Sequence, residues 1–220
     1  MSLPNLEIVL ATRNKKKIEE IRRILKDIPI PILSLDDFIG CPDIEEDADT
    51  FEANAVKKAV SVTRYTDKPA LADDSGLEVY ALKGAPGVSS ARYAGRGAND
   101  RENLEKLLHE MHSIDDERRG ARFVCYVALA YPDGSVNTFY GYAEGRIGRE
   151  PRGENGFGYD PVFYPDGYDK TFAEMTPDEK DSVSHRGKAL RKLYRYLKSI
   201  IRKTNMVILI FFLKNFLFLS

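Results

Sequence analysis

The order of the apolar segments limits the folds that this chain can adopt. A short apolar run at 7–11 is followed, from Lys15, by apolar residues three or four positions apart, which predicts a buried strand and then an amphipathic helix. A weak strand at 30–35 and a second helix, with Asp49 as its predicted N-cap, come next. Such alternation is typical of a sheet whose faces are covered by helices.

The second half of the chain has a different order. A third helix is predicted at 101–111, and apolar runs at 123–131 and 136–143 flank a Pro-Asp-Gly turn, which indicates an antiparallel hairpin. A last helix is expected to begin near Ser184. We therefore predict an α/β fold with a mixed sheet, in one folding unit that can form two lobes around a cleft.

Two acids, a hydroxyl and a glycine interrupt the apolar sequence LADDSGLEVY at residues 71–80. One strand is predicted to end at Ala72 and another to start at Leu77, so that 73–76 forms a turn. These residue types can serve the hydrogen bonds of a turn alone, but they also suit a metal or phosphate site. Taken by itself, the stretch favours the plain turn.

Composition and charge narrow the functional classes. The 220-residue chain is 43% hydrophobic and 30% charged, as is usual for a globular domain, and its net charge of -1 provides no overall basic field for nucleic acid. Cys41 and Cys125 have no metal-ligand spacing and are interpreted as reduced thiols. The N-terminus lacks the pattern of a signal peptide, so we expect a cytoplasmic protein.

Two predicted helices begin with positive charges, where the helix dipole favours acids. Lys15, Lys16 and Lys17 open the first helix, and His185 and Arg186 open the last. Each such cation costs about 0.3–1 kcal/mol unless an anion lies at the same end, where free N–H groups would also bind it. Lysines that simply point into solvent are the alternative. The chain has neither a GxxxxGK[ST] nor a GxGxxG sequence, so neither of these nucleotide motifs is supported.

Clustered carboxylates near a phosphate site are typical of Mg²⁺, which binds one or two of them together with substrate oxygens. The candidates are Glu45 and Glu46 in an acidic loop, and Asp73 and Asp74 in the predicted turn. Since neighbouring side chains of a strand point to opposite faces, we expect Asp73 and Asp74 to differ in role. One would bind metal while the other orients water.

Two further segments could contribute to a site. Lys58 lies beside the apolar stripe of the second helix, with Asn54 one turn before it. A lysine in that position more often extends its ammonium to solvent than it binds a ligand. The loop 156–161 places Phe157 and Tyr159 between glycines, where aromatic side chains either anchor in the core or stack on a base.

Four stretches of the sequence together resemble the inosine-triphosphate pyrophosphatase family. They are LATRNKKKIEEI, LADDSGLEVYALKGAPGVSSARY, NGFGYDPVFYPDGYDKTFAEM and EKDSVSHRGKAL, and the resemblance covers about residues 5–200 in the family's order. It implies hydrolysis of ITP, dITP and XTP to the monophosphate and pyrophosphate, with Mg²⁺ as cofactor. It also implies an elongated mixed β-sheet with flanking helices, two lobes around a central cleft, and a homodimer.

The resemblance also assigns roles to residues. The family's phosphate motif T-G-N-x-x-K falls on Thr12, Asn14 and Lys17, and Arg13 stands where the family usually has glycine. A glycine there would allow close backbone approach, so the contact at position 13 is in question.

The family's metal-binding glutamate falls on Glu46, with Glu45 as the alternative. Its catalytic base falls on Asp74, which also contributes to the metal site, and Ser75 follows as a substrate contact. The resemblance implies that the base-binding residues are Phe157, Gly158, Tyr159, Asp160, Lys180, His185 and Arg186. Further candidate contacts are Asn54, Lys58 and Arg92. The 73–76 segment would then be where Mg²⁺ and the attacking water meet the substrate.

Three other functions are compatible with parts of the sequence. A Maf-like pyrophosphatase acting on other nucleotides is the nearest alternative, but the Ser-His-Arg segment at 184–186 argues against it. A nucleotide-binding module without catalysis would not need the acids. A nucleic-acid binder, suggested by the lysines at 15–17, has little support from the net charge.

The C-terminal segment 205–220 is almost wholly apolar and lacks an amphipathic period. We expect residues 1–203 to form a single nucleotide pyrophosphatase domain and 204–220 to be an apolar tail outside it. The tail is shorter than the roughly 18–20 residues that a membrane span needs. Membrane contact is therefore the less favoured interpretation, and the tail is expected to be dispensable.

Overall fold

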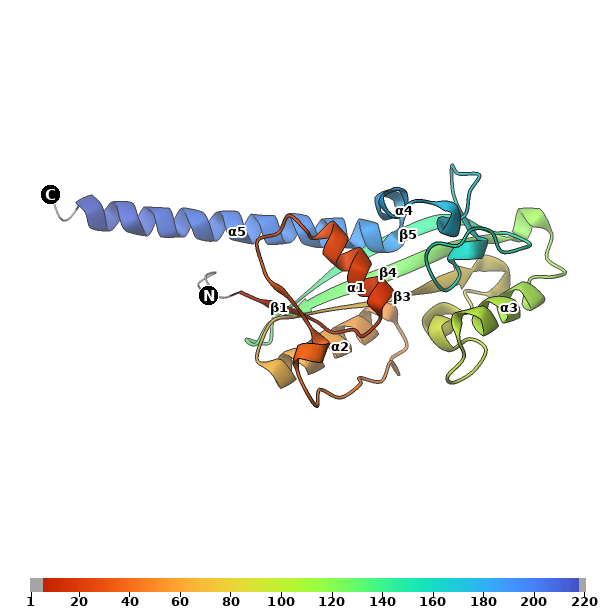
Figure 1. The fold of residues 1–220 in the computed structure, drawn as a ribbon, viewed down its shortest axis with the longest axis horizontal. Coiled ribbons are helices and arrows are strands. Elements are labelled where there is room, and N and C mark those ends of the chain that lie inside the picture. Colours follow the sequence, from red (N-terminus) through yellow and green to blue (C-terminus); the bar gives the residue numbers. More distant parts are fainter. Residues whose placement is uncertain (1–5, 218–220) are drawn as a thin grey trace.

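A computed structural model describes residues 6–217, with side chains for residues 6–203. Its centre is a mixed six-stranded sheet in the order β2-β1-β3-β4-β5-β6 (Figure 1). β1 runs parallel to β2 and β3, and the pairs from β3 to β6 are antiparallel. The strands are β1 (Ile8–Leu10), β2 (Ile32–Ser34), β3 (Ala70–Val79), β4 (Gly120–Ala130), β5 (Val136–Ile147) and β6 (Phe163–Pro165). The predicted α/β fold and hairpin are confirmed.

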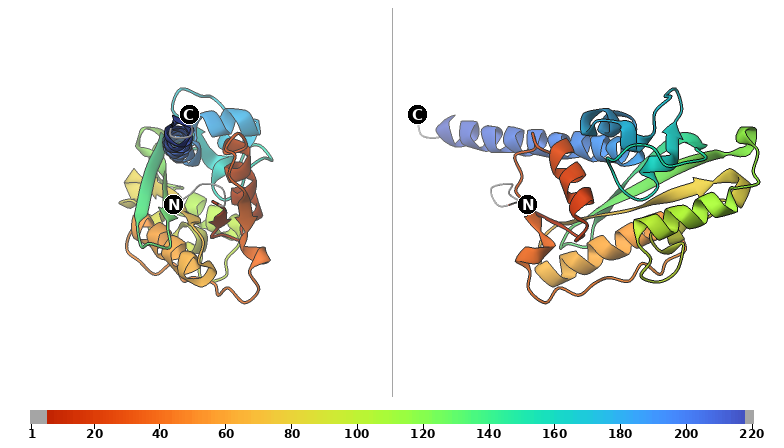
Figure 2. Two further views of the ribbon diagram at one scale, coloured as in Figure 1. Left: turned by 90° about the vertical axis from the view of Figure 1, so that its left-hand side faces the viewer. Right: turned by 45° about the vertical axis from the view of Figure 1, so that its right-hand side comes forward.

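Helices cover both faces of this sheet. The α-helices are α1 (Lys15–Ile24), α2 (Phe51–Thr66), α3 (Asp100–Glu110), α4 (Pro177–Val183) and α5 (His185–Leu217). Helices α1 and α5 pack on one face, and α2 packs on the other (Figures 1 and 2). Helix α3 lies toward the far end of the long strands.

The hydrophobic core is divided between the two ends of the molecule. At one end, alternating residues of β1 point to opposite faces: Ile8 and Leu10 pack with α1 and α5, and Val9 packs with α2. A separate cluster at the other end joins Leu77 of β3 to α3, β6 and the segment around Phe172. Strands β3, β4 and β5 run through both ends, which gives the elongated two-lobed shape (Figure 2).

The predicted turn at 73–76 is wrong, because β3 is one continuous ten-residue strand. Asp73 pairs with Val127, and the register continues through Gly76 opposite Val124. The polar residues occupy the part of the strand between the two hydrophobic clusters, where charged groups from other elements surround them. Gly76 is required by close packing: a Cβ there would lie 2.4 Å from Ser90 Oγ and 2.7 Å from the Gly87 carbonyl oxygen.

Helices α1, α3 and α5 start within one residue of their predicted positions, whereas α4 was not predicted and the N-cap of α2 differs. The N-cap of α2 is Thr50, whose hydroxyl accepts from Ala53 N at 3.1 Å, and not the predicted Asp49. Both residues can cap a helix, and sequence alone does not distinguish neighbouring caps.

Helix α5 begins at His185 as expected, and it continues without a break past the proposed tail boundary at 203/204 to Leu217. It projects well beyond the rest of the molecule (Figure 1). The side chains of the predicted tail, 204–220, lie outside the described residues. Among the described residues, no helix combines the length and apolar character needed to cross a membrane.

Candidate active site

A cavity of about 390 Å³ lies where the polar part of β3 meets the turns after β1 and before α5. Residues from both ends of the molecule contribute to its lining. It brings together these predicted site residues: Thr12, Arg13, Asn14, Lys17, Glu46, Lys58, Asp74, Ser75, Phe157, Gly158, Tyr159, Asp160, Lys180, His185 and Arg186. The predicted residues outside its lining are Lys15, Lys16, Glu45, Asn54, Asp73 and Arg92.

Two of the residues outside the lining hold the acidic loop in place. Arg92 Nη2 donates to the Glu46 carbonyl oxygen at 2.9 Å, and Asn54 Oδ1 accepts from Ala48 N at 2.9 Å. Both bonds fix the backbone next to Glu46. Their structural role is therefore to position a candidate metal ligand.

Three of the other residues outside the lining, Lys15, Lys16 and Glu45, have surface positions, whereas the fourth, Asp73, is buried. Lys15 is exposed, and Glu45 is exposed with its carboxylate 3.8 Å from Arg96. Lys16 Nζ donates to the Gly156 carbonyl oxygen at 2.5 Å, which ties the start of α1 to the loop before Phe157. Glu46 is thus the glutamate of the acidic loop that faces the cavity.

Arg13 occupies the family's glycine position without backbone strain, since its φ is not positive. Its guanidinium pairs with Asp43 and donates to the Cys41 carbonyl oxygen at 2.9 Å. Arg13 therefore links the turn after β1 to the acidic loop at the edge of the cavity.

The start of α1 is already capped. Asn14 Oδ1 accepts from the N–H groups of Lys16 and Lys17, and Asn14 N donates to Thr12 Oγ1. At the start of α5, Gly187 N donates to Ser184 Oγ. The expectation that these particular N–H groups are free for an anion is wrong, because short polar side chains of the chain satisfy them.

A carboxylate of the protein itself pairs with the cations that open both helices. Asp73 Oδ2 lies 3.0 Å from Lys17 Nζ and 3.0 Å from Arg186 Nη2. Burial alone would raise the pKa of Asp73, but Lys17, Arg186 and Lys58 together hold it well below its usual range. Asp73 is therefore an ionised structural counter-charge, on the opposite face of β3 from Asp74.

Asp74 faces the cavity next to Glu46 and Lys58. Lys58 Nζ lies 2.5 Å from Glu46 Oε1 and 3.7 Å from Asp74 Oδ1. Burial raises the pKa of Asp74 to about 6, and Glu46 adds to this while Lys58 opposes it. A carboxylate with its pKa in this range can accept a proton near neutral pH.

The same pair of carboxylates fits a divalent cation. Glu46 and Asp74 both line the cavity and already accommodate a positive charge, the Lys58 ammonium. Within residues 6–203, no group of three or more Asp, Glu, His or Cys side chains could hold a metal ion. Mg²⁺ often binds through one or two carboxylates and completes its shell with phosphate oxygens and water, so two acids in an open cavity suit it.

An aromatic ring also lines the cavity. Phe157 is half-buried, with Lys180 Nζ 4.9 Å and the Arg186 guanidinium 5.5 Å from its ring centroid. Tyr159 is buried instead, and its hydroxyl donates to the Ser90 carbonyl oxygen at 2.8 Å. Of the two alternatives for these aromatic residues, Tyr159 is the core anchor, and Phe157 is the ring available for stacking.

Arg186 lies beside this ring, and His185 lines the same cavity with a different hydrogen-bonding state. His185 stacks on Phe123 at 4.6 Å, and its Nδ1 has no partner among the described residues. Burial, and then Arg186 and Lys180, lower the pKa of His185 well below its ordinary value, so the ring is neutral. Arg186 donates to Asp73, Glu20 and Ser75.

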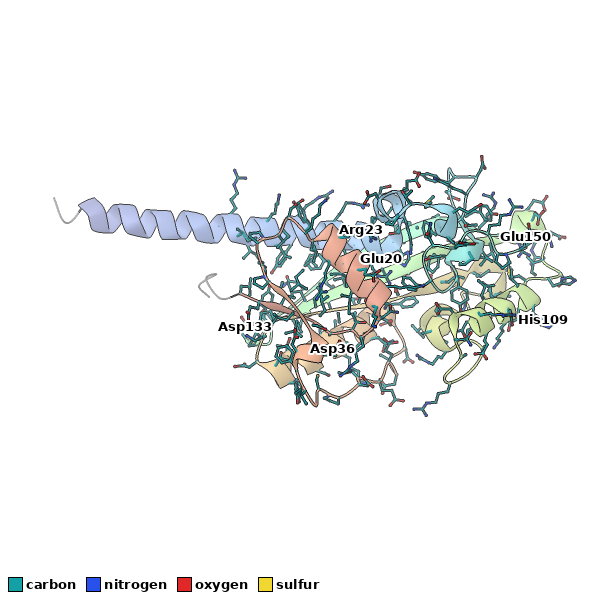
Figure 3. All side chains as sticks on the ribbon, viewed as in Figure 1. Glu20, Arg23, Asp36, His109, Asp133 and Glu150 are labelled. Carbon is teal, nitrogen blue, oxygen red and sulfur yellow. The ribbon has the colours of Figure 1, made fainter. Side chains whose placement is uncertain are left out.

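Glu20 is a site residue that the sequence interpretation missed. It is buried on α1, with Arg23 one turn further along (Figure 3), and its carboxylate bridges Lys180 Nζ at 2.8 Å and Arg186 Nη1 at 2.6 Å. The signal was its place next to the buried Ile21, where an acid needs a partner.

Helix α3 also contributes two residues that were missed, Asp100 and Asn103. Asp100 Oδ2 accepts from Gly158 N at 2.8 Å, which holds the Phe157 loop against α3. Residues three or four positions apart, such as Asp100 and Asn103, share a helix face, but nothing in the sequence shows that this face meets the loop.

A family model described as the Ham1 family matches residues 8–196 of the chain. A protein of Desulforamulus reducens named dITP/XTP pyrophosphatase is 48% identical over 195 residues, which are 89% of this chain and 97% of that protein. A protein of Geobacter sulfurreducens with the same name is 50% identical over 190 residues, 86% of this chain and 96% of its own length.

Solved structures have the same fold. A HAM1 protein from Coxiella burnetii superposes with a TM-score of 0.81 at 46% identity, and the match covers 88% of this chain and 99% of that one. The Ham1 protein of Staphylococcus aureus gives a TM-score of 0.79 at 40% identity, covering 88% of this chain and 98% of the other.

Proposed function

This chain belongs to the Ham1 family, and on that premise we propose that it hydrolyses the non-standard purine nucleoside triphosphates dITP, XTP and ITP to the monophosphate and pyrophosphate. The resemblance identified in the sequence is confirmed by this membership. The observation that carries the proposal is a single cavity whose lining combines acids and lysines with a cation-flanked aromatic ring.

The acids and lysines that line the cavity suit a triphosphate. Lys17 and Lys58 bring positive charge to the lining, and Thr12 and Asn14 add polar groups beside them. Lys17 and the turn after β1 would hold the leaving pyrophosphate, because fixed cations stabilise the charge that develops on it. The Lys17–Asp73 pair fixes this ammonium in position before substrate arrives.

Asp74 is the proposed general base. It would accept a proton from the water that attacks the α-phosphorus, and its pKa of about 6 makes it an effective acceptor at neutral pH. Glu46 and Asp74 would hold Mg²⁺, which when bound neutralises phosphate charge. The metal is part of the proposal, and its site is supported by the donor set described above.

The aromatic ring that lines the cavity suits a purine base. Phe157 would stack on the base, and Arg186 would face its 6-oxo group. Arg186 already makes four hydrogen bonds, so of its five N–H groups one on Nη1 remains for a ligand. A single remaining donor matches an oxo acceptor and leaves a mismatch with the amino group of adenine. It does not by itself distinguish GTP.

The decisive experiment is a nucleotide panel assayed for pyrophosphate release with and without Mg²⁺. We expect turnover of dITP, XTP and ITP to exceed that of ATP, and to require a divalent cation. Asp74→Asn should lower kcat by about 10²–10⁴-fold, as loss of a general base does, while nucleotide binding remains. Binding without turnover by the wild-type chain would indicate the non-catalytic module, and a preference for other nucleotides would indicate a Maf-like enzyme.

Two expectations complete the proposal. A homodimer is expected from the family resemblance and is tested by light scattering of the purified chain. We also expect the protein to act on the cytoplasmic nucleotide pool. Its two cysteines, Cys41 and Cys125, are both free and buried, as is common where thiols stay reduced.

A further inference from the structure

One buried lysine occupies the gap between the two candidate metal ligands. Lys58 Nζ lies 2.5 Å from Glu46 Oε1 and 3.7 Å from Asp74 Oδ1. It also donates to the Asp73 carbonyl oxygen at 2.6 Å. The ammonium is thus held by three oxygens from two segments, the acidic loop and β3, at the place where a divalent cation would need both carboxylates.

The position of Lys58 is set by its helix. Its side chain is only 10% exposed, on the face of α2 that carries the buried residues Ala55, Ala59 and Val62. The neighbouring Lys57 is 40% exposed and pairs with Asp47 away from the cavity. The side chain of Lys58 is therefore buried, whereas that of Lys57 extends toward solvent.

Electrostatics explains why a cation is needed there. Glu46 raises the pKa of Asp74 beyond the effect of burial, so the two acids repel each other. Burial opposes the charge on Lys58, yet Asp73, Asp74 and Glu46 outweigh it and raise the pKa of its ammonium. Two close carboxylates in a poorly solvated site require a compensating positive charge.

We propose that Lys58 is an internal counter-cation that neutralises Glu46 and Asp74 in the nucleotide-free protein and leaves the gap when a divalent cation binds. Lys58 then sets the metal affinity of the empty site and makes it weak. Metal would enter mainly together with the triphosphate, whose oxygens supply the missing ligands. This role rests on the metal-dependent reaction proposed above, but its test needs no turnover.

The test is a Mn²⁺ titration of nucleotide-free protein, followed by calorimetry and by the loss of free-ion electron paramagnetic resonance signal. Lys58→Met keeps the apolar stem and removes the charge. We expect it to bind Mn²⁺ about tenfold more tightly than wild type, because the competing charge is gone. Lys57→Met is the matched control: it removes the same charge one residue away, and its Mn²⁺ affinity should equal that of wild type.

Several results would overturn the proposal. If Lys58→Met binds Mn²⁺ as tightly as wild type, more weakly, or too weakly to detect, the proposal is wrong. Damage to the structure can only lower the Mn²⁺ affinity, whereas removal of a competing cation raises it. An undiminished gain in a Lys58→Met, Glu46→Gln double variant would place the ion elsewhere. Lys58→Gln, which keeps a donor for Asp73, is the second variant.

Folding of the variants is part of the same test. If both Lys58 variants unfold in EDTA, rescue by Mn²⁺ at concentrations that leave wild-type melting unchanged supports the role, and failure of rescue refutes it. The proposed activity is checked separately by dITP turnover of the wild-type chain. A wild-type chain without turnover whose Lys58→Met variant still binds Mn²⁺ more tightly would refute the function and leave the counter-cation role standing.

Discussion

Asp73 and Asp74 are neighbours on one strand, and replacing each by asparagine should change stability in opposite directions. Asp73 is ionised and paired with Lys17 and Arg186 in the interior. Asp74 has its pKa raised by burial and by Glu46, so its ionised form is disfavoured in the folded state. The two variants have the same change of atoms and of charge, one residue apart.

The loss of unfolding free energy in Asp73→Asn depends on the cations that no longer have a carboxylate partner. Arg186 keeps Glu20 at 2.6 Å, but Lys17 loses the carboxylate that lies 3.0 Å from it. Removing one partner of a buried ion pair costs about 3–5 kcal/mol, because the other charge stays buried. For a chain of this length that corresponds to a fall of about 6–20 °C in melting temperature.

The effect of Asp74→Asn depends on pH. Its folded pKa, about 6, lies above the ordinary 3.8, so ionised Asp74 costs the fold about 3 kcal/mol at pH well above 6. This cost is absent well below pH 3.8, where the group is protonated in both states; it grows as pH rises from 3.8 to 6 and is complete above 6. Asparagine removes this cost, but about 1 kcal/mol of the gain is lost because the hydrogen bond from Ser75 N becomes weaker. The variant should therefore be more stable than wild type by about 2 kcal/mol at pH 8, and this gain should disappear by pH 4.

Urea unfolding in EDTA, followed from pH 4 to pH 8, measures both effects without interference from metal. The Asp73→Asn deficit should be constant from pH 5 to pH 8, because a carboxylate with a depressed pKa contributes its full stability above its unfolded value. Equal destabilisation by the two variants would refute the different electrostatic roles assigned to them. A gain for Asp74→Asn that does not shrink toward pH 4 would refute the raised pKa.

Three other changes test packing and the tail. Glu20→Gln should lower unfolding free energy by about 3 kcal/mol, since it leaves two buried cations short of a carboxylate, whereas Glu19→Gln on the exposed side should have no effect in the same melt. Gly76→Ala should cost about 1–3 kcal/mol in urea unfolding, because its Cβ would lie 2.4 Å from Ser90 Oγ; unchanged stability would mean that the backbone yields there. A chain ending at Lys203 should keep its melting temperature and dITP turnover, and a marked loss of either would place the tail in the core.

Local pattern was sufficient for the order of most elements and for most of the predicted cavity residues, although α4 and β6 were not predicted. The apolar periods identified β1, α1 and the β4–β5 hairpin because each buries a face of its own residues. The motifs located the lining because they lie in turns and strand segments that the fold brings together. Asp73, Lys16 and Glu45 are exceptions, since the direction of a side chain depends on contacts that a motif does not contain.

Long-range charge compensation could not be predicted. The 73–76 segment looked like a turn because two acids are unfavourable in a buried strand, and only the fold shows that Lys17, Lys58 and Arg186 converge on them. The same network also affects how the proposed contact between Arg186 and the 6-oxo group can be tested by an Arg186→Ala variant. Because Arg186 also pairs with Glu20 and Asp73, its loss would disturb the fold as well as recognition.

The uninterrupted pairing of β3 with β4 has a mechanical consequence. Ten consecutive residue pairs, from Ala70 opposite Ala130 to Val79 opposite Ala121, cross the whole floor of the cavity. A ladder of this length resists bending, so it joins the two ends of the molecule as a stiff element that carries Asp74, the proposed general base. The other parts of the candidate site lie on loops that side chains tether to the fold: Arg92 holds the acidic loop, and Asp100 holds the loop that carries Phe157.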